Sequence, residues 1–283
     1  MTELLSLDDR DWLESRLQQH VTDLSEYSFA NLYLFRHAHG YRIVREPLPA
    51  VSGTTYDGVR HLLPLFDLAS HAPPILARAL GDHAVFYPIP AEDLEPLNGG
   101  QFEISHNEDD SDYVYETEAL RRYRGSQLRK KLNQMRQFER QCEPVFEPLG
   151  PTDIAAAHTV LQRWLEESGK RIEATDYGPT HEALTHYSTL GLTGHLARTR
   201  ADEPVGFLLG SYTPSSFVVR FAKGLRSYPG VFPFLFNRLA LSLPESVQHL
   251  NFEQDLGNPR FQLNKRSYAP CALLRKYRIR PKH

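Results

Sequence analysis

The sequence of 283 residues has few of the features that cross-link a protein or anchor it in a bilayer. Cys142 and Cys271 are its only cysteines, so a disulfide framework is excluded and we expect reduced thiols. Its longest apolar runs, such as GFLLG and FPFLF, fall well short of the ~18 residues that a membrane-spanning helix needs. The first residues, MTELLSLDDRDW, show no signal peptide, which predicts a cytoplasmic protein without a transmembrane segment.

Several catalytic and nucleotide-binding motifs are also missing. The chain has no Gly-x-x-x-x-Gly-Lys-Ser/Thr loop, no Gly-x-Gly-x-x-Gly and no Gly-x-Ser-x-Gly, which argues against P-loop enzymes, dinucleotide-binding enzymes and α/β-hydrolases. The 13 histidines are scattered, and the closest pair, His37 and His39, lacks a neighbouring cluster of cysteines or carboxylates. The sequence therefore predicts no metal site.

Positive charge is present but unevenly distributed. The net charge is only −3, yet residues 117–140 carry eight Lys or Arg against two acids, and residues 260–283 carry eight against none. Two basic segments on an otherwise acidic chain indicate a local anion site. The alternative is a solvated helix face and a basic tail.

The order of expected elements indicates the fold. In the second half, helices are expected at 152–168 and 179–191, a three-stranded antiparallel meander at 194–225, a helix from Pro233, and strands near 248–254 and 271–279. This is the order of the Gcn5-related N-acyltransferase fold. The first half echoes it, with expected helices at 7–20 and 72–80 and strands near 41–47, 58–66, 84–90 and 111–116. We therefore expect an α+β protein with two acyltransferase-like domains in tandem, at 1–148 and 149–283, each a mixed sheet flanked by helices.

Three segments carry a resemblance to a known family: DLSEYSFANLYLFR, DYVYETEALRRYRGSQLRKKLNQMRQF and NFEQDLGNPRFQLNKRSYAP. In this order they resemble the soluble C-terminal domain of bacterial phosphatidylglycerol lysyltransferases. The resemblance implies a tandem Gcn5-related fold and a relationship to enzymes that transfer amino acids from aminoacyl-tRNA. Transferase members of the family place the aminoacyl group on a lipid head group.

The basic middle segment is expected to form an amphipathic helix from Ser126 onward. Leu128, Leu132, Met135 and Phe138 fall on one side, which predicts a face packed against the core. Beside it a row of Arg129, Asn133, Arg136 and Arg140 is spaced to grip successive phosphates. With the residues of the tail, the candidate substrate-binding residues are Arg121, Arg124, Arg129, Lys130, Lys131, Asn133, Arg136, Arg260, Lys265, Arg266 and Tyr268.

The segment NFEQDLGNPR has the highest density of residues suited to acid–base chemistry. Acyl transfer needs a group that accepts a proton and donors that stabilise the oxyanion. Glu253 and Asp255 are therefore the candidate bases, and Lys223 is the candidate that binds phosphate or polarises the carbonyl. The alternative is that Asp255 and Asn258 only form a turn.

These observations favour an acyltransferase that moves an aminoacyl group from a phosphate-bearing donor, aminoacyl-tRNA, to a lipid or amine acceptor. Its partners would be that tRNA and an anionic lipid head group, and it would need no cofactor, acting in the cytoplasm or at the membrane surface. One alternative is an N-acetyltransferase with acetyl-CoA as cofactor. The stretch LRSYPGVFPF fits this poorly, because Gly230 comes one residue late for a pyrophosphate-binding turn and Pro229 removes a backbone donor. A second alternative is a non-catalytic module that binds RNA or anionic membrane.

Overall fold

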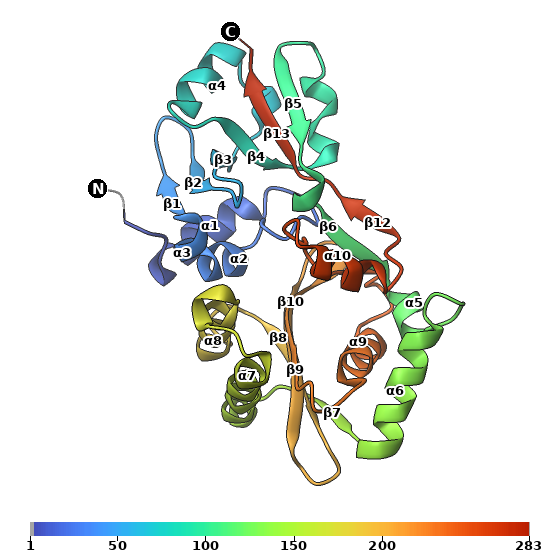
Figure 1. Ribbon diagram of the computed structural model, residues 1–283. Coiled ribbons are helices and arrows are strands. Elements are labelled where there is room, and N and C mark those ends of the chain that lie inside the picture. The colour runs from blue at the N-terminus through green and yellow to red at the C-terminus, as the bar shows by residue number, and fades with distance from the viewer. Residues whose placement is uncertain (1–2, 283) are drawn as a thin grey trace. The chain divides into compact units, whose positions relative to one another are not determined.

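The chain folds into two units that do not follow a division into first and second halves (Figure 1). A computed structural model describes residues 3–282. Unit 1 contains the chain up to Asp112, then Gln254–Asn258, then the segment from Leu273 onward. Unit 2 contains Tyr113–Glu253 and Pro259–Ala272.

The boundary expected at residues 148 and 149 therefore lies elsewhere. The first break falls between Asp112 and Tyr113, within strand β6 (Asp112–Glu116). The reason is strand pairing: β6 pairs antiparallel with β11 (His249–Asn251), so the residues that follow Asp112 join the sheet of unit 2. The basic segment belongs to unit 2 as a result.

Unit 1 is built on a six-stranded sheet with the order β1-β2-β3-β4-β13-β5. The pair β3–β4 is parallel and its other pairs are antiparallel. Side chains from across the sequence form its core, among them Leu62, Phe86 and Ile279. The strands are β1 (Arg42–Val44), β2 (Ala50–Thr54), β3 (Arg60–Pro64), β4 (Val85–Ile89), β5 (Phe102–His106) and β13 (Tyr277–Pro281).

The described residues of unit 1 also form four α-helices. Helix α4 begins with two prolines, which suit the first helical positions, and buries Leu76 and Leu80 in the core. Every residue of α2 is buried, as the aromatic sequence SFANLYLF predicts for a packed segment. The helices are α1 (Arg10–Leu17), α2 (Phe29–Leu34), α3 (Arg36–His39) and α4 (Pro73–Leu80).

Unit 2 contains a seven-stranded sheet with the order β12-β6-β11-β10-β9-β8-β7. The expected meander is present as three antiparallel strands, and β11 adds to β10 in parallel, so this sheet is also mixed. Its further strands are β7 (Val145–Pro148), β8 (Thr193–Arg198), β9 (Pro204–Tyr212), β10 (Ser216–Gly224) and β12 (Ala272–Leu274).

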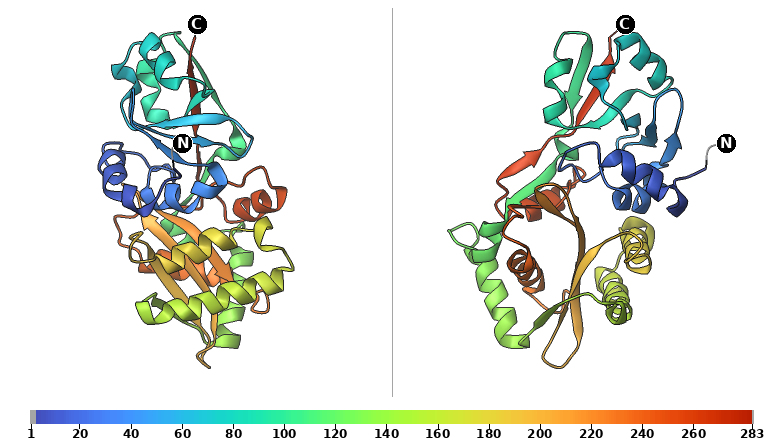
Figure 2. Two further views of the ribbon diagram at one scale, coloured as in Figure 1. Left: turned by 90° about the vertical axis from the view of Figure 1, so that its left-hand side faces the viewer. Right: turned by 180° about the vertical axis from the view of Figure 1, so that it is seen from behind.

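Helices cover both faces of this sheet (Figure 2). Helices α7 and α8 lie on one side of the meander, and α9 lies on the other side with α6 packed against it. The helices of unit 2 are α5 (Thr117–Arg122), α6 (Arg129–Cys142), α7 (Ile154–Ser168), α8 (Tyr177–Thr185), α9 (Val231–Ser242) and α10 (Pro259–Arg266).

The expected class, α+β with two mixed sheets flanked by helices, is confirmed. So is the order of elements in the second half, with two exceptions. Helix α10 occupies part of a stretch expected to be a turn, and the single strand expected near 271–279 is two strands, β12 and β13, which belong to different sheets. The basic helix begins at Arg129 rather than at Ser126, and its apolar side packs inward as expected, with Leu128, Met135 and Phe138 buried. Strands β2, β5 and β7 and helices α2, α3 and α5 were not expected.

Candidate active site

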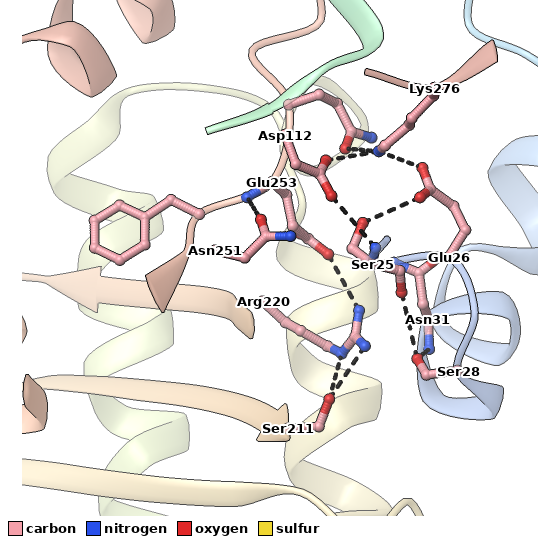
Figure 3. Close-up of polar contacts among 12 residues, drawn as sticks. Ser25, Glu26, Ser28, Asn31, Asp112, Ser211, Arg220, Asn251, Glu253 and Lys276 are labelled. Carbon is pink, nitrogen blue, oxygen red and sulfur yellow. Dashed lines mark hydrogen bonds and ion pairs between the residues drawn. The ribbon is translucent and has the colours of Figure 1, made fainter. Parts of the chain in front are cut away.

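A buried guanidinium lies within strand β10 of unit 2 (Figure 3). The pairing register of β10 shifts between Val219 and Phe221, so Arg220 occupies a β-bulge, a feature that redirects a side chain. Its side chain is 0% exposed, and Nη1 donates to Glu253 Oε1 at 3.1 Å. Nε and Nη2 both donate to Ser211 Oγ, at 3.2 and 3.1 Å. A buried charge is tolerated only with such partners.

Glu253 follows β11 and is held from two sides. Its backbone N–H donates to Oδ1 of the buried Asn251 at 2.7 Å, and its φ of +56° is uncommon for a residue with a side chain. Its carboxylate pairs with Arg220 and keeps 13% of the side-chain surface exposed. Two residues after the end of β11, unit 2 thus holds a fixed, partly accessible carboxylate.

Lys265 of α10 contacts the backbone beside this carboxylate. Its Nζ donates to the carbonyl oxygens of Phe252 at 2.5 Å and Glu253 at 2.8 Å. Tyr115 Oη donates to the carbonyl oxygen of Lys265 at 2.9 Å, which fixes α10 against strand β6. An ammonium so close to Glu253 makes this end of α10 part of the candidate site.

The beginning of α6 meets the segment after α10 at an aromatic cluster. Lys131 Nζ lies 3.8 Å from the centroid of the buried Tyr268 ring, a cation–π contact. Tyr268 also packs against Phe236 and Phe252. Burial, together with the charge of Lys130, lowers the pKa of Lys131 to about 8. The mid-chain basic helix and the Pro259–Tyr268 segment are therefore neighbours within unit 2.

Most of the remaining candidate substrate-binding residues point toward solvent. The row on α6 is exposed along its length, which leaves its cations accessible to a polyanion. The exposed candidates are Arg124, Arg129, Lys130, Asn133, Arg136, Arg260 and Arg266.

Arg121 has a contact that the sequence did not indicate. Its guanidinium donates to the carbonyl oxygens of Ala240 at 2.8 Å and Leu243 at 3.0 Å, at the C-terminal end of α9. Carbonyl groups there lack partners within the helix, and a cation stabilises them. The contact gives Arg121 a structural role.

Lys223 lies in a different network from Glu253. Its Nζ donates to both carboxylate oxygens of Asp176, at 2.6 and 2.7 Å, and lies 4.1 Å from the centroid of the Trp164 ring. Burial lowers the pKa of Lys223, although Asp176 opposes this shift. A phosphate or carbonyl ligand would have to displace Asp176 before it could reach this ammonium.

Asp255 belongs to unit 1 and forms a turn. Its Oδ1 accepts the N–H of Gly257 at 2.9 Å, and its carbonyl accepts the N–H of Asn258 at 3.0 Å. The side chain is buried, with 2% of the residue exposed. These contacts match the turn-forming alternative described for Asp255.

Unit 1 contains a buried polar network that sequence reasoning missed (Figure 3). Lys276 Nζ contacts Glu26 Oε1 at 2.5 Å, Asp112 Oδ1 at 2.6 Å and Gln254 Oε1 at 2.9 Å. Burial lowers the pKa of Lys276, but the two carboxylates outweigh it and raise the pKa above the ordinary value. Ser25 donates through its N–H to Asp112 and through its hydroxyl to Glu26. The signal available in the sequence is Ser25-Glu26 within DLSEYSF, whereas Lys276 lies in a basic segment that does not distinguish it from its neighbours.

The turn before α9 is already occupied by a carboxylate. The N–H groups of Arg226 and Ser227 donate to Glu167 Oε2, at 2.5 and 3.4 Å, and the Ser227 hydroxyl donates to Glu167 Oε1 at 2.7 Å. Gly230, with φ +95°, lies against α6, where an added Cβ would come within 2.2 Å of the carbonyl oxygen of Gln134. Donors that a pyrophosphate would need are therefore engaged inside unit 2.

Two mixed sheets with this order of helices and strands define an acyltransferase-like fold. The model of the family "Phosphatidylglycerol lysyltransferase, C-terminal" matches residues 18–280, and the chain belongs to that family. The resemblance read from the three sequence segments is thereby confirmed. No curated protein matches the chain.

Solved structures share the fold at low sequence identity. A conserved protein of unknown function from Bacteroides thetaiotaomicron is 20% identical, with a TM-score of 0.83 and 99% of each chain covered. The C-terminal domain of a putative lysylphosphatidylglycerol synthetase from Agrobacterium fabrum is 15% identical, with a TM-score of 0.63, 95% of this chain and 92% of that chain covered. L-PGS from Bacillus licheniformis is 16% identical, with a TM-score of 0.63. The match covers 97% of this chain and 92% of that chain.

Within residues 3–282, the helices are all too short or too polar to cross a membrane.

Proposed function

We propose that this protein is an aminoacyltransferase that moves an aminoacyl group from aminoacyl-tRNA to a lipid head group or an amine. The family name supports the lipid acceptor, since it describes lysyl transfer to phosphatidylglycerol. The reaction would take place in the cytoplasm or at a membrane surface and would need no cofactor.

One observation carries the proposal: the cationic start of α6 meets the Pro259–Tyr268 segment next to Glu253. Lys131 contacts Tyr268, and Lys265 contacts the carbonyl oxygen of Glu253. An exposed row of guanidinium groups on α6 and a fixed carboxylate in the same unit suit a donor that is both a polyanion and an ester.

The roles follow from the chemistry of ester aminolysis or transesterification. The acceptor amine or hydroxyl attacks the ester carbonyl carbon, a new C–N or C–O bond forms, and the bond to the tRNA ribose oxygen breaks. Glu253 would accept the proton of the attacking group, and that proton would pass to the ribose oxygen as it leaves. Arg220 would hold Glu253 in place, which makes it a positioning residue.

The acetyl-CoA alternative has less support. A pyrophosphate would have to displace Glu167 from the N–H groups of Arg226 and Ser227. It would also meet a helix end at Gly230 that is packed against the backbone of Gln134. Calorimetry with acetyl-CoA tests this directly, and tight binding would favour the N-acetyltransferase.

The proposal is tested with charged tRNA and vesicles that contain phosphatidylglycerol, with peptide amines as a second acceptor. We expect transfer of labelled amino acid by the wild-type protein. Glu253→Gln should retain tRNA affinity but lose transfer, whereas a pure binding module would have no transfer to lose. Absence of both transfer and tRNA binding across the panel would refute the proposal.

The tRNA surface has a matched control. Arg129→Ala/Lys130→Ala removes one exposed Arg and one exposed Lys from α6, and Lys170→Ala/Arg171→Ala removes the same pair from an exposed site elsewhere in unit 2. The first double variant should reduce the slope of log K against log salt by about 2, one for each lost phosphate contact. The second should leave the slope unchanged.

A further inference from the structure

Three side chains with metal-binding atoms meet at one end of the sheet in unit 2. They are Glu116 at the end of β6, His249 at the start of β11 and Cys271 just before β12 (β6 and β12 are labelled in Figure 1). Their ligand atoms, a carboxylate oxygen, an imidazole nitrogen and the thiol sulfur, all lie within 4.8 Å of one another. No other triad of this kind occurs among the described residues.

Strand pairing places these three residues together. His249 lies directly opposite Glu116 in the antiparallel β6–β11 pair, and its Nε2 is 3.6 Å from Glu116 Oε1. Cys271 is held against the same strand, since its N–H donates to the carbonyl oxygen of Val114 at 2.8 Å. Its Sγ is 3.3 Å from that oxygen. The cluster is therefore determined by the backbone of three segments far apart in sequence.

The ligand set suits one class of metal. A thiolate, an imidazole and a carboxylate form a mixed set of ligands of intermediate softness. Such a set binds zinc more tightly than it binds magnesium or calcium. Around a tetrahedral zinc ion, ligand atoms are about 3.3–3.7 Å apart, and the His249–Glu116 separation already falls in that range. The Glu116 side chain is 55% exposed and His249 is 31% exposed, so small rotations can close the remaining distances.

We propose that Glu116, His249 and Cys271 form a three-ligand zinc site, with water as the fourth ligand. The carboxylate and the thiolate would neutralise the charge of the ion. Bound metal would join β6, β11 and the segment leading into β12, directly before the start of α5. This site is independent of the acyl-transfer proposal and uses none of the residues assigned to it.

Cobalt(II) titration of the reduced, metal-free protein tests the site without any activity assay. We expect one equivalent of Co²⁺ to produce thiolate-to-cobalt charge-transfer absorption with the intense visible bands of tetrahedral coordination, and Zn²⁺ to displace it. Cys271→Ser should abolish the charge-transfer band and weaken Zn²⁺ binding by more than about 100-fold, beyond the effect of losing an outer-sphere partner. Zn²⁺ should raise the Tm of the wild type and not that of Cys271→Ser.

Two further variants make the outcome decisive. Cys142→Ser removes the other cysteine, on α6, and should bind like the wild type. Glu116→Gln changes a largely exposed side chain, so it should fold normally and still lose affinity. The proposal is overturned if the wild type shows no thiolate band, if Cys271→Ser binds Zn²⁺ within about threefold of the wild type, or if Cys142→Ser loses the band instead.

Discussion

At the scale of single residues, burial separates the charged side chains that build the fold from those available to a ligand. Arg220 and Lys223 are both buried on strand β10, yet Arg220 holds Glu253 whereas Lys223 is paired with Asp176. The sequence indicated Glu253 because the segment NFEQDLGNPR is dense in residues suited to acid–base chemistry. It gave no reason to choose Arg220, because a bulge shifts the register there and the bulge depends on the neighbouring strand.

His61 provides a prediction at this scale. Only 1% of it is exposed, and neither ring nitrogen has a hydrogen-bond partner among the described residues. Burial, with nearby His39, lowers the pKa of His61 from 6.5 to about 3. The unfolded chain therefore binds this proton more readily, so stability should fall as pH drops below 6.5 toward 3.

His61→Leu should remove that contribution. Urea titrations at several pH values measure the free energy of unfolding. Between pH 6 and pH 4, we expect this free energy to fall by about 2 kcal/mol more in the wild type than in the variant, with a slope of up to about 1.4 kcal/mol per pH unit. At pH 7 the variant should be at least as stable, because it no longer buries polar atoms without partners. His37→Leu, at an exposed position, is the control and should follow the wild type. Equal acid sensitivity of wild type and His61→Leu would contradict the prediction.

At the scale of elements, periodicity predicted helices and strands better than it predicted their ends. The apolar side of α6 packs inward as expected, and the meander forms where turn residues separate three apolar runs. Helix α10 was missed because Pro259 follows Gly257-Asn258, a strong turn signal, and because no residue of α10 is buried, so it has no apolar stripe to detect.

Gly230 tests how α6 and α9 pack. Gly230→Ala adds a Cβ that would lie 2.2 Å from the carbonyl oxygen of Gln134, in a residue with φ +95°. We expect the free energy of unfolding to fall by about 2–4 kcal/mol, because backbone strain and overpacking act together. Gly125→Ala is the matched control, since Gly125 has φ +91° and nothing within 4 Å of the added atom. Urea unfolding should show the larger loss for Gly230→Ala, and equal losses would mean that the contact with Gln134 costs nothing.

At the scale of the whole molecule, the chain crosses between its units more than once. Its last strand, β13, lies inside the sheet of unit 1 between β4 and β5. Lys276, just before that strand, contacts Glu26 across a sequence separation of 250 residues. A boundary placed at residues 148 and 149 could not describe such a path, because strand pairing joins segments that are distant in sequence.

Lys276→Met should show how much the contacts of Lys276 with Glu26 and Asp112 contribute to the stability of unit 1. The variant leaves Glu26 and Asp112 buried without their ammonium partner, which typically costs about 3–5 kcal/mol. Chemical denaturation at pH 7 measures the loss. Lys282→Met, at an exposed position near the same end of the chain, should change stability by less than about 0.5 kcal/mol. Similar stabilities of the two variants would show that the buried network does not stabilise unit 1.

The sequence by itself determined the class of fold, the order of elements in the second half, the family and the amphipathic basic helix. These depend on local periodicity, turn residues and the order of motifs, all of which can be read directly from the linear sequence. Tertiary structure alone decided which charges are buried in pairs, where the units divide, and that Glu116, His249 and Cys271 meet. Those outcomes depend on strand register and on segments brought together across more than a hundred residues, which no local pattern encodes.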